Sequence, residues 1–110
     1  MIYDIPGDEF IYEGVTYRVG AKVVATEGSD YAGLNGFIRE IRTEDDRETD
    51  NETPDIYCYF DPPCLPRDLE ELEERFSKLY GKEMKADDIT LALDIMARDM
   101  LLALGSTGTT

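Results

Sequence analysis

The sequence predicts a small α+β fold with about five to six antiparallel strands and one amphipathic helix at 68–80. Two observations predict this class. Short runs rich in β-branched and aromatic residues are separated by glycine-containing turns, and one later stretch repeats its apolar residues at helical spacing. A length of 110 residues is typical of one domain with one modest core. We therefore expect a single domain over 1–104 and a disordered tail over 105–110.

The strongest turn signals lie in residues 19–41. Gly20 opens an apolar run and Gly28 closes it, while Gly33 and Gly36 bracket a tight return into a second apolar run. Glycine tolerates positive φ and allows another backbone to approach closely. This stretch therefore predicts a strand, an ordered loop and a second strand.

Two further features refine the predicted strands. Residues 10–19 predict a hairpin, because two β-rich runs are joined at 13–14 by Glu-Gly, which suits a primed turn. Farther along, Ile38 and Ile41 cannot both face the core of a regular strand, because successive side chains alternate between its faces. We expect a bulge at 39–40 that lets both side chains enter the core.

Residues 55–60 form the clearest single strand, and they include one of the two cysteines. Cys58 lies on the same face as Ile56 and Phe60, which favours a small buried core residue. Cys64 lies in a proline-rich crossing segment, where exposure is an open alternative. Two cysteines without histidine leave half of a tetrahedral zinc shell empty, so we expect no zinc site and two reduced thiols.

The helix predicted at 68–80 has clear boundary signals. Asp68 and Glu71 resemble a capping box at its start, and Gly81 suits the position after its end. Its apolar residues recur on one stripe, which we expect to pack on the sheet. The stripe comprises Leu69, Leu72, Phe76 and Leu79.

The C-terminal segment fits two secondary structures. Apolar and other residues alternate over 89–95, as in a strand, whereas the apolar residues of 92–100 also fit a helix. We expect a closing strand at 89–93, because an unpaired sheet edge is an aggregation hazard. A short helical piece is then expected at 97–104.

Charge is the strongest compositional feature. The chain has 25 acidic and 11 basic residues, no histidine and a net charge of -14. Residues 44–74 hold 13 of the acids but only two arginines. Such an excess repels nucleic-acid phosphates, so we expect no direct nucleic-acid binding. A basic protein surface would instead be attracted.

Catalytic and metal-binding motifs are missing from the sequence. It has no histidine, no nucleophile elbow and no phosphate-binding glycine loop with its lysine. The acids of 46–50 alternate as in a calcium loop, but position twelve is Tyr57 instead of a bidentate acid. We expect no enzymatic activity, cofactor or metal. No long apolar run or leader is evident, so we also expect a cytoplasmic protein without a membrane span.

The glycine spacing resembles the KOW motif, the strand-loop-strand unit of SH3-like barrels in ribosomal proteins and transcription elongation factors. The matching positions are Gly20, Val23, Gly28, Gly33, Gly36, Ile38 and Ile41, within about a fifth of the chain. The resemblance implies an SH3-like barrel whose loop contacts RNA or protein. The loop is one residue longer than the usual pattern and lacks the family's basic residues, so the resemblance bears on the fold more than on the activity.

The whole chain also resembles small acidic proteins of plasmids, conjugative elements and phages. The similar stretches are 29–33, 55–57 and 87–89. This resemblance implies an anti-CRISPR or anti-restriction inhibitor that imitates nucleic acid and blocks the basic groove of a nuclease, such as the guide and target channel of a CRISPR effector.

We expect two acidic stretches to form one continuous anionic surface that binds the partner, with Tyr31 as an apolar anchor. The candidate acidic residues are Glu44, Asp45, Asp46, Glu48, Asp50, Glu52, Glu70, Glu71, Glu73 and Glu74. A plain solvated loop and a wet helix face remain open for the same residues. The alternative function is a KOW-like accessory module that docks on a ribonucleoprotein or transcription complex through residues 28–36.

Overall fold

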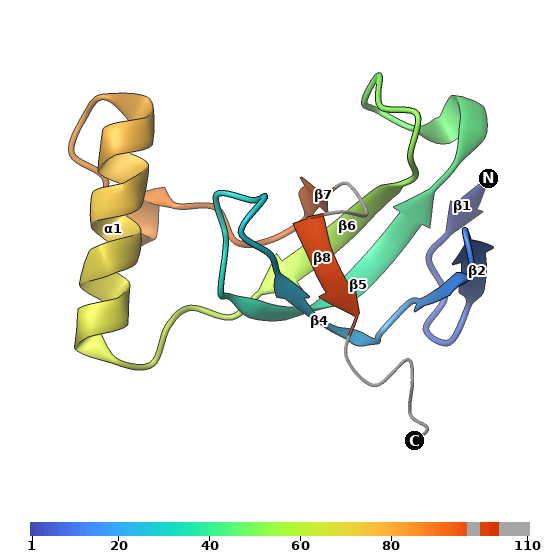
Figure 1. The fold of residues 1–110 in the computed structure, drawn as a ribbon, viewed down its shortest axis with the longest axis horizontal. Helices are drawn as coiled ribbons and strands as arrows, with labels where there is room; N and C mark the ends of the chain where they lie inside the picture. Colours follow the sequence, from blue (N-terminus) through green and yellow to red (C-terminus); the bar gives the residue numbers. More distant parts are fainter. Residues whose placement is uncertain (97–99, 104–110) are drawn as a thin grey trace.

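The computed structural model describes residues 1–96 and 100–103 and shows a small α+β fold (Figure 1). One six-stranded antiparallel sheet has the order β7-β6-β5-β4-β8, with β1 also paired to β5, and β2 and β3 form a separate hairpin. The strands are β1 (Ile2–Tyr3), β2 (Glu9–Tyr12), β3 (Val15–Arg18), β4 (Lys22–Ala25), β5 (Asn35–Arg42), β6 (Asp55–Phe60), β7 (Asp94–Met96) and β8 (Leu101–Ala103). The helices are α1 (Pro66–Tyr80) and the short 3-10 helices η1 (Glu44–Asp46) and η2 (Ala86–Asp88).

The predicted strand-loop-strand unit is confirmed as β4, a loop at 26–34 and β5. Gly20 and Gly33 have φ values of 97° and 88°, which residues other than glycine rarely adopt. Gly36 serves a different purpose, because a Cβ there would overlap the carbonyl oxygen of Tyr59 on β6. Gly28 is the exception, since its φ is not positive.

The predicted bulge is confirmed in β5. The register of β5 against β6 shifts between Ile38 and Glu40. Ile38 and Ile41 are in consequence both fully buried, with 0% exposure. The extra residue therefore turns both isoleucines toward the core, as the sequence predicted.

The predicted hairpin is confirmed as β2 and β3, with positive φ at both turn residues, Glu13 and Gly14. The helix is also confirmed, but it begins at Pro66, two residues earlier than predicted. No side-chain cap is present at Leu65, so the capping box was wrong. Proline at the first helical position, whose φ is already helical, starts the helix instead.

The apolar stripe of α1 is confirmed only in part. Leu72 and Phe76 are buried, whereas Leu79 is 50% exposed near the helix end. Gly81 ends the helix with a left-handed φ of 69°, as expected. Leu72 and Phe76 join a core formed mainly by the sheet strands, with Val23, Ile38, Ile41, Ile56 and Cys58 at its centre.

The C-terminal strand was placed wrongly. Residues 89–93 are not a strand, because Leu93 adopts a positive φ of 55° and the extended segment starts after it, as β7. Ile89 is nevertheless buried. Residues 101–103 pair with β4 as β8, so the helix predicted at 97–104 is wrong there. Residues 97–99 and 104 of that predicted helix, and the predicted tail at 105–110, lie outside the described residues.

Closure of the sheet into a barrel is not confirmed. β7 and β8 stand at the two ends of the hydrogen-bonded order, and no ladder joins them within residues 1–96 and 100–103. In the same part of the chain, no helix is both long enough and apolar enough to cross a membrane.

Gly36→Ala tests the close approach of β5 to β6. The added methyl would collide with the Tyr59 carbonyl and with the Phe60 ring, 2.9 Å away, so we expect a loss of about 1–3 kcal/mol or more in the free energy of unfolding. Urea denaturation measures it. The control Asn35→Ala, at an exposed neighbouring site, should change stability little, and equal effects of both substitutions would contradict this account.

Candidate functional site

The two predicted acidic stretches lie at opposite ends of the molecule (Figure 1). Residues 44–52 belong to the connection between β5 and β6 at one end of the sheet. β6 then runs back along β5, and α1 begins beyond the other end of β6. The expected continuous anionic surface is therefore wrong, and the acids form two separate patches. We call them the acidic loop (44–52) and the helix patch (Glu70, Glu71, Glu73 and Glu74).

A buried carboxylate holds the acidic loop in place. Asp55, which is only 1% exposed, accepts hydrogen bonds from the backbone nitrogens of Glu48 at 2.7 Å and Thr49 at 3.0 Å. The Thr49 hydroxyl donates a third to the same side chain. Hydrogen bonds to an ionised acceptor are about twice as strong as neutral ones. The loop therefore has fixed backbone contacts, although most of its side chains are exposed.

Two carboxylates of the acidic loop are paired within the protein. Glu48 lies 3.1 Å from Nη1 of Arg42, and Asp46 lies 2.5 Å from the amino nitrogen of Met1. The other four are exposed and form no ion pair with any described residue. These unpaired carboxylates are Glu44, Asp45, Asp50 and Glu52.

The helix patch is more fully committed to contacts within the protein. Glu71 and Glu74 pair with Arg75 at 3.6 Å and Lys78 at 3.2 Å. Glu73 accepts a 2.8 Å hydrogen bond from the Ala86 backbone and so supports the start of η2. Within the described chain only Glu70 of this patch makes no such contact. The helix patch is thus a weaker candidate for binding a partner than the acidic loop.

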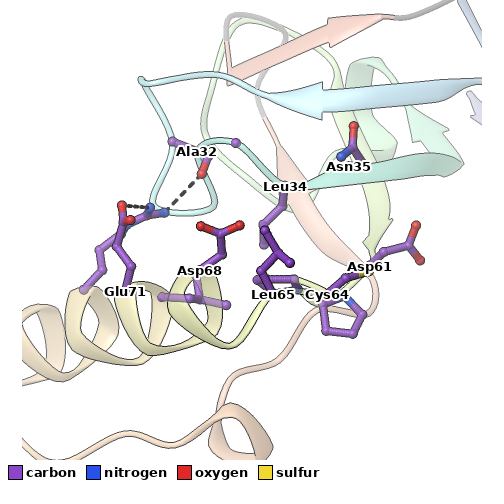
Figure 2. Close-up of a pocket in the computed structure, with 13 residues that line it drawn as sticks. Ala32, Leu34, Asn35, Asp61, Cys64, Leu65, Asp68 and Glu71 are labelled. Carbon is purple, nitrogen blue, oxygen red and sulfur yellow. Dashed lines mark hydrogen bonds and ion pairs between the residues drawn. The ribbon is translucent and has the colours of Figure 1, made fainter.

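A groove between the 26–34 loop and α1 was missed by the sequence analysis. Its volume is about 500 Å³, and Asp68 and Glu71 of α1 face Ala32 and Leu34 of the loop across it (Figure 2). Arg75 fixes the loop by donating to the carbonyl oxygens of Asp30 at 2.9 Å and Ala32 at 3.2 Å. These contacts could not be predicted from the sequence, because Arg75 binds backbone carbonyl groups, which every residue has.

Tyr31, predicted as an apolar anchor, is largely used by the fold. Its ring lies 5.4 Å from the rings of both Phe60 and Phe76. Its hydroxyl donates to Oδ1 of Asp94 at 2.9 Å and to the carbonyl of Thr90 at 3.2 Å. Tyr31 therefore fastens the 26–34 loop to the core.

Burial raises the pKa of both Asp94 and Cys58. It raises the pKa of Asp94 to about 6, against the lowering effect of the Tyr31 hydrogen bond, and Oδ2 of Asp94 is buried without a partner in the described structure. Burial, helped by the Asp94 charge, raises the pKa of the Cys58 thiol to about 12. Cys58 thus stays protonated and unreactive at neutral pH, as a core residue should.

Cys64, whose exposure the sequence left open, is exposed in the groove between the loop and α1. Within residues 1–96 and 100–103, no three histidine, cysteine, aspartate or glutamate side chains are grouped as a metal site. No protein-family model, curated protein or solved structure matches the chain. The geometry alone therefore has to identify the best candidate site.

Asp94→Asn tests the buried carboxyl. The folded-state pKa of about 6 exceeds the ordinary 3.8, so the fold favours the protonated form, and this contribution is complete below pH 3.8 and lost as pH rises through 6. Urea midpoints of both proteins should nearly coincide at pH 4, and the variant should become the more stable one by pH 7.5. A difference that does not change with pH would contradict the assignment.

Proposed function

We propose that the protein is a non-enzymatic, cytoplasmic module that binds a basic protein surface through its acidic loop. In this proposal it imitates nucleic acid and blocks the basic groove of a nucleic-acid enzyme, as an anti-CRISPR or anti-restriction inhibitor does. The observation that carries it is a group of four exposed carboxylates on one anchored loop that pair with no residue of 1–96 or 100–103, in a chain of net charge -14. A CRISPR effector or another nuclease would be the partner.

Two properties of the acidic loop support this role. Four of its carboxylates form no ion pair with a described residue, so their potential attracts cationic surfaces and speeds encounter. Asp55 also holds the loop backbone before binding, which reduces the ordering entropy that association costs. A flexible loop of equal charge would lose more free energy on binding.

Replacing Glu44, Asp45 and Glu52 with their amides tests the proposal. We expect the wild-type protein to inhibit DNA binding and cleavage by a susceptible member of a panel of purified CRISPR and restriction nucleases. Inhibition should weaken as salt rises, because the charges are exposed. The variant should lose about tenfold or more in affinity, since each exposed pair contributes up to about 1 kcal/mol.

The matched control replaces Glu70, Glu71 and Glu74 with glutamine, which removes three charges at the other end of the molecule. It should keep most of the inhibition. Equal losses in both variants would show that net charge alone matters. The proposal would be contradicted if the protein bound no nuclease of the panel, or if its affinity did not change with salt concentration.

The groove beside the 26–34 loop favours a second candidate function. In this proposal the fold is related to SH3-like barrels without a closed ladder, and the protein is a KOW-like accessory module that docks on a ribonucleoprotein or transcription complex through residues 28–36. Arg75 and Tyr31 fix this loop against α1 and the core, which is the preorganisation that a docking loop needs.

Joint replacement of Asp30 and Asn35 with alanine tests this second candidate, because both side chains are exposed within residues 28–36 and alanine adds no charge that would attract RNA. Retention on ribosomes or RNA polymerase in sedimentation and pull-down assays should fall severalfold in a loop-docking module. An inhibitor that uses the acidic loop should be unaffected. Unchanged retention on those complexes would remove the second candidate.

A further inference from the structure

An aromatic pocket lies directly beside the acidic loop. Its volume is about 340 Å³, within the range of about 300–1,000 Å³ that is common for ligand sites. Tyr3 of β1 and Phe10 and Tyr12 of β2 form one wall, and Glu44, Arg47 and Glu52 of the loop also line it. The segment before the first hairpin, the hairpin and the acidic loop thus build one concave site.

The aromatic wall is well defined. The ring centroids of Tyr3 and Phe10 are 5.4 Å apart, and those of Phe10 and Tyr12 are 6.2 Å apart. All three side chains are only partly buried, so part of each ring is accessible to a ligand. Adjacent aromatic rings supply a large apolar contact area at a small entropic cost.

Arg47 determines which chemistry the pocket favours. Its Nε donates to the carbonyl of Glu44 at 2.9 Å, while its Nη1 is buried without a hydrogen-bond partner in the described structure. This nitrogen is closed off from the pocket, so Arg47 acts on a ligand through its charge and not through this donor. The guanidinium would repel a cation that entered the pocket. The carboxylates of Glu44 and Glu52 would attract a cation at its edge.

We propose that this pocket binds a peptide segment of the basic partner in which an aliphatic residue or proline is flanked by lysine or arginine. The apolar residue packs on Tyr3, Phe10 and Tyr12, the Arg47 charge keeps cations out of the pocket interior, and the flanking cations pair with Glu44 and Glu52. This inference rests on the proposed function, because it assumes a basic protein as the partner. The aromatic pocket would make binding depend on the partner's sequence, whereas the acidic loop alone would select only for positive charge.

Two synthetic hexapeptides test the inference with the full chain. The first has lysine pairs around a central leucine-proline, and the second has glycine-glycine at its centre with the same charge. Titration calorimetry should show about tenfold tighter binding of the first peptide, the effect of burying one aliphatic side chain. In NMR spectra, only that peptide should shift the ring signals of Tyr3, Phe10 and Tyr12 and the Arg47 side-chain signal.

Phe10→Leu should remove the preference for the leucine-proline peptide. Phe37→Leu is its matched control, since Phe37 is an exposed aromatic residue of β5 outside the pocket. Thermal unfolding establishes that both variants are folded, and Tyr3→Ala replaces Phe10→Leu if the latter unfolds. Equal affinity for both peptides, a preference that survives in the pocket variant, or binding of neither peptide would overturn the inference.

Failure of the inference can be distinguished from failure of the proposed function. If both peptides bind equally and both lose affinity when Glu44, Asp45 and Glu52 become amides, the pocket is not a site but the acidic loop still binds cations. If those three substitutions also leave the affinity for both peptides unchanged, and no nuclease is inhibited, the proposed function fails as well.

Discussion

The antiparallel pairing of β5 with β6 is the constraint on which the rest of this structure depends. Gly36 lets the two strands approach without collision, and the bulge after Ile38 turns both isoleucines of β5 into the core. Because the strands run side by side, their connection lies at one end of the sheet, while α1 starts at the other. The same pairing that forms the core therefore separates the two groups of acidic residues.

This separation changes how the charge of the protein should be understood. At the helix end, Glu71, Glu73 and Glu74 are used in local contacts. At the loop end, four carboxylates have no ion-pair partner in the part of the chain that the structure describes, and the buried Asp55 holds the loop. Exposed ion pairs add little stability, but these pairs offset the charges of Glu71 and Glu74 within the helix. The unpaired acids make no ion pair with a described residue, so their charges are available to a partner.

Features encoded by local residue types were predictable from the sequence. Positive φ at Gly20 and Gly33, the primed turn of the first hairpin and the bulge after Ile38 each follow from the steric demands of a few neighbouring residues. The C-terminal strand was not predictable in this way. The alternation of apolar residues at 89–93 does not require a strand, because Ile89 is buried although its backbone is irregular. No residue type in this stretch predicts the positive φ of Leu93.

The candidate site was harder to predict than the fold, because it depends on distances between segments. Sequence proximity suggested that the acids at 44–52 and 70–74 would meet, but the intervening strand carries the chain from one end of the sheet to the other. The aromatic pocket was missed for the converse reason. Tyr3 and Phe10 are far in sequence from Arg47, and only the packing of the folded chain brings them together.

Carboxylate-to-lysine cross-linking on a complex with an inhibited nuclease, followed by mass spectrometry, tests the central claim most directly. The account predicts that cross-links from this protein map to Glu44, Asp45, Asp50 and Glu52 and reach lysines in the basic groove of the nuclease. Cross-links confined to Glu70, Glu71 and Glu74, or spread evenly over both ends of the molecule, would contradict it.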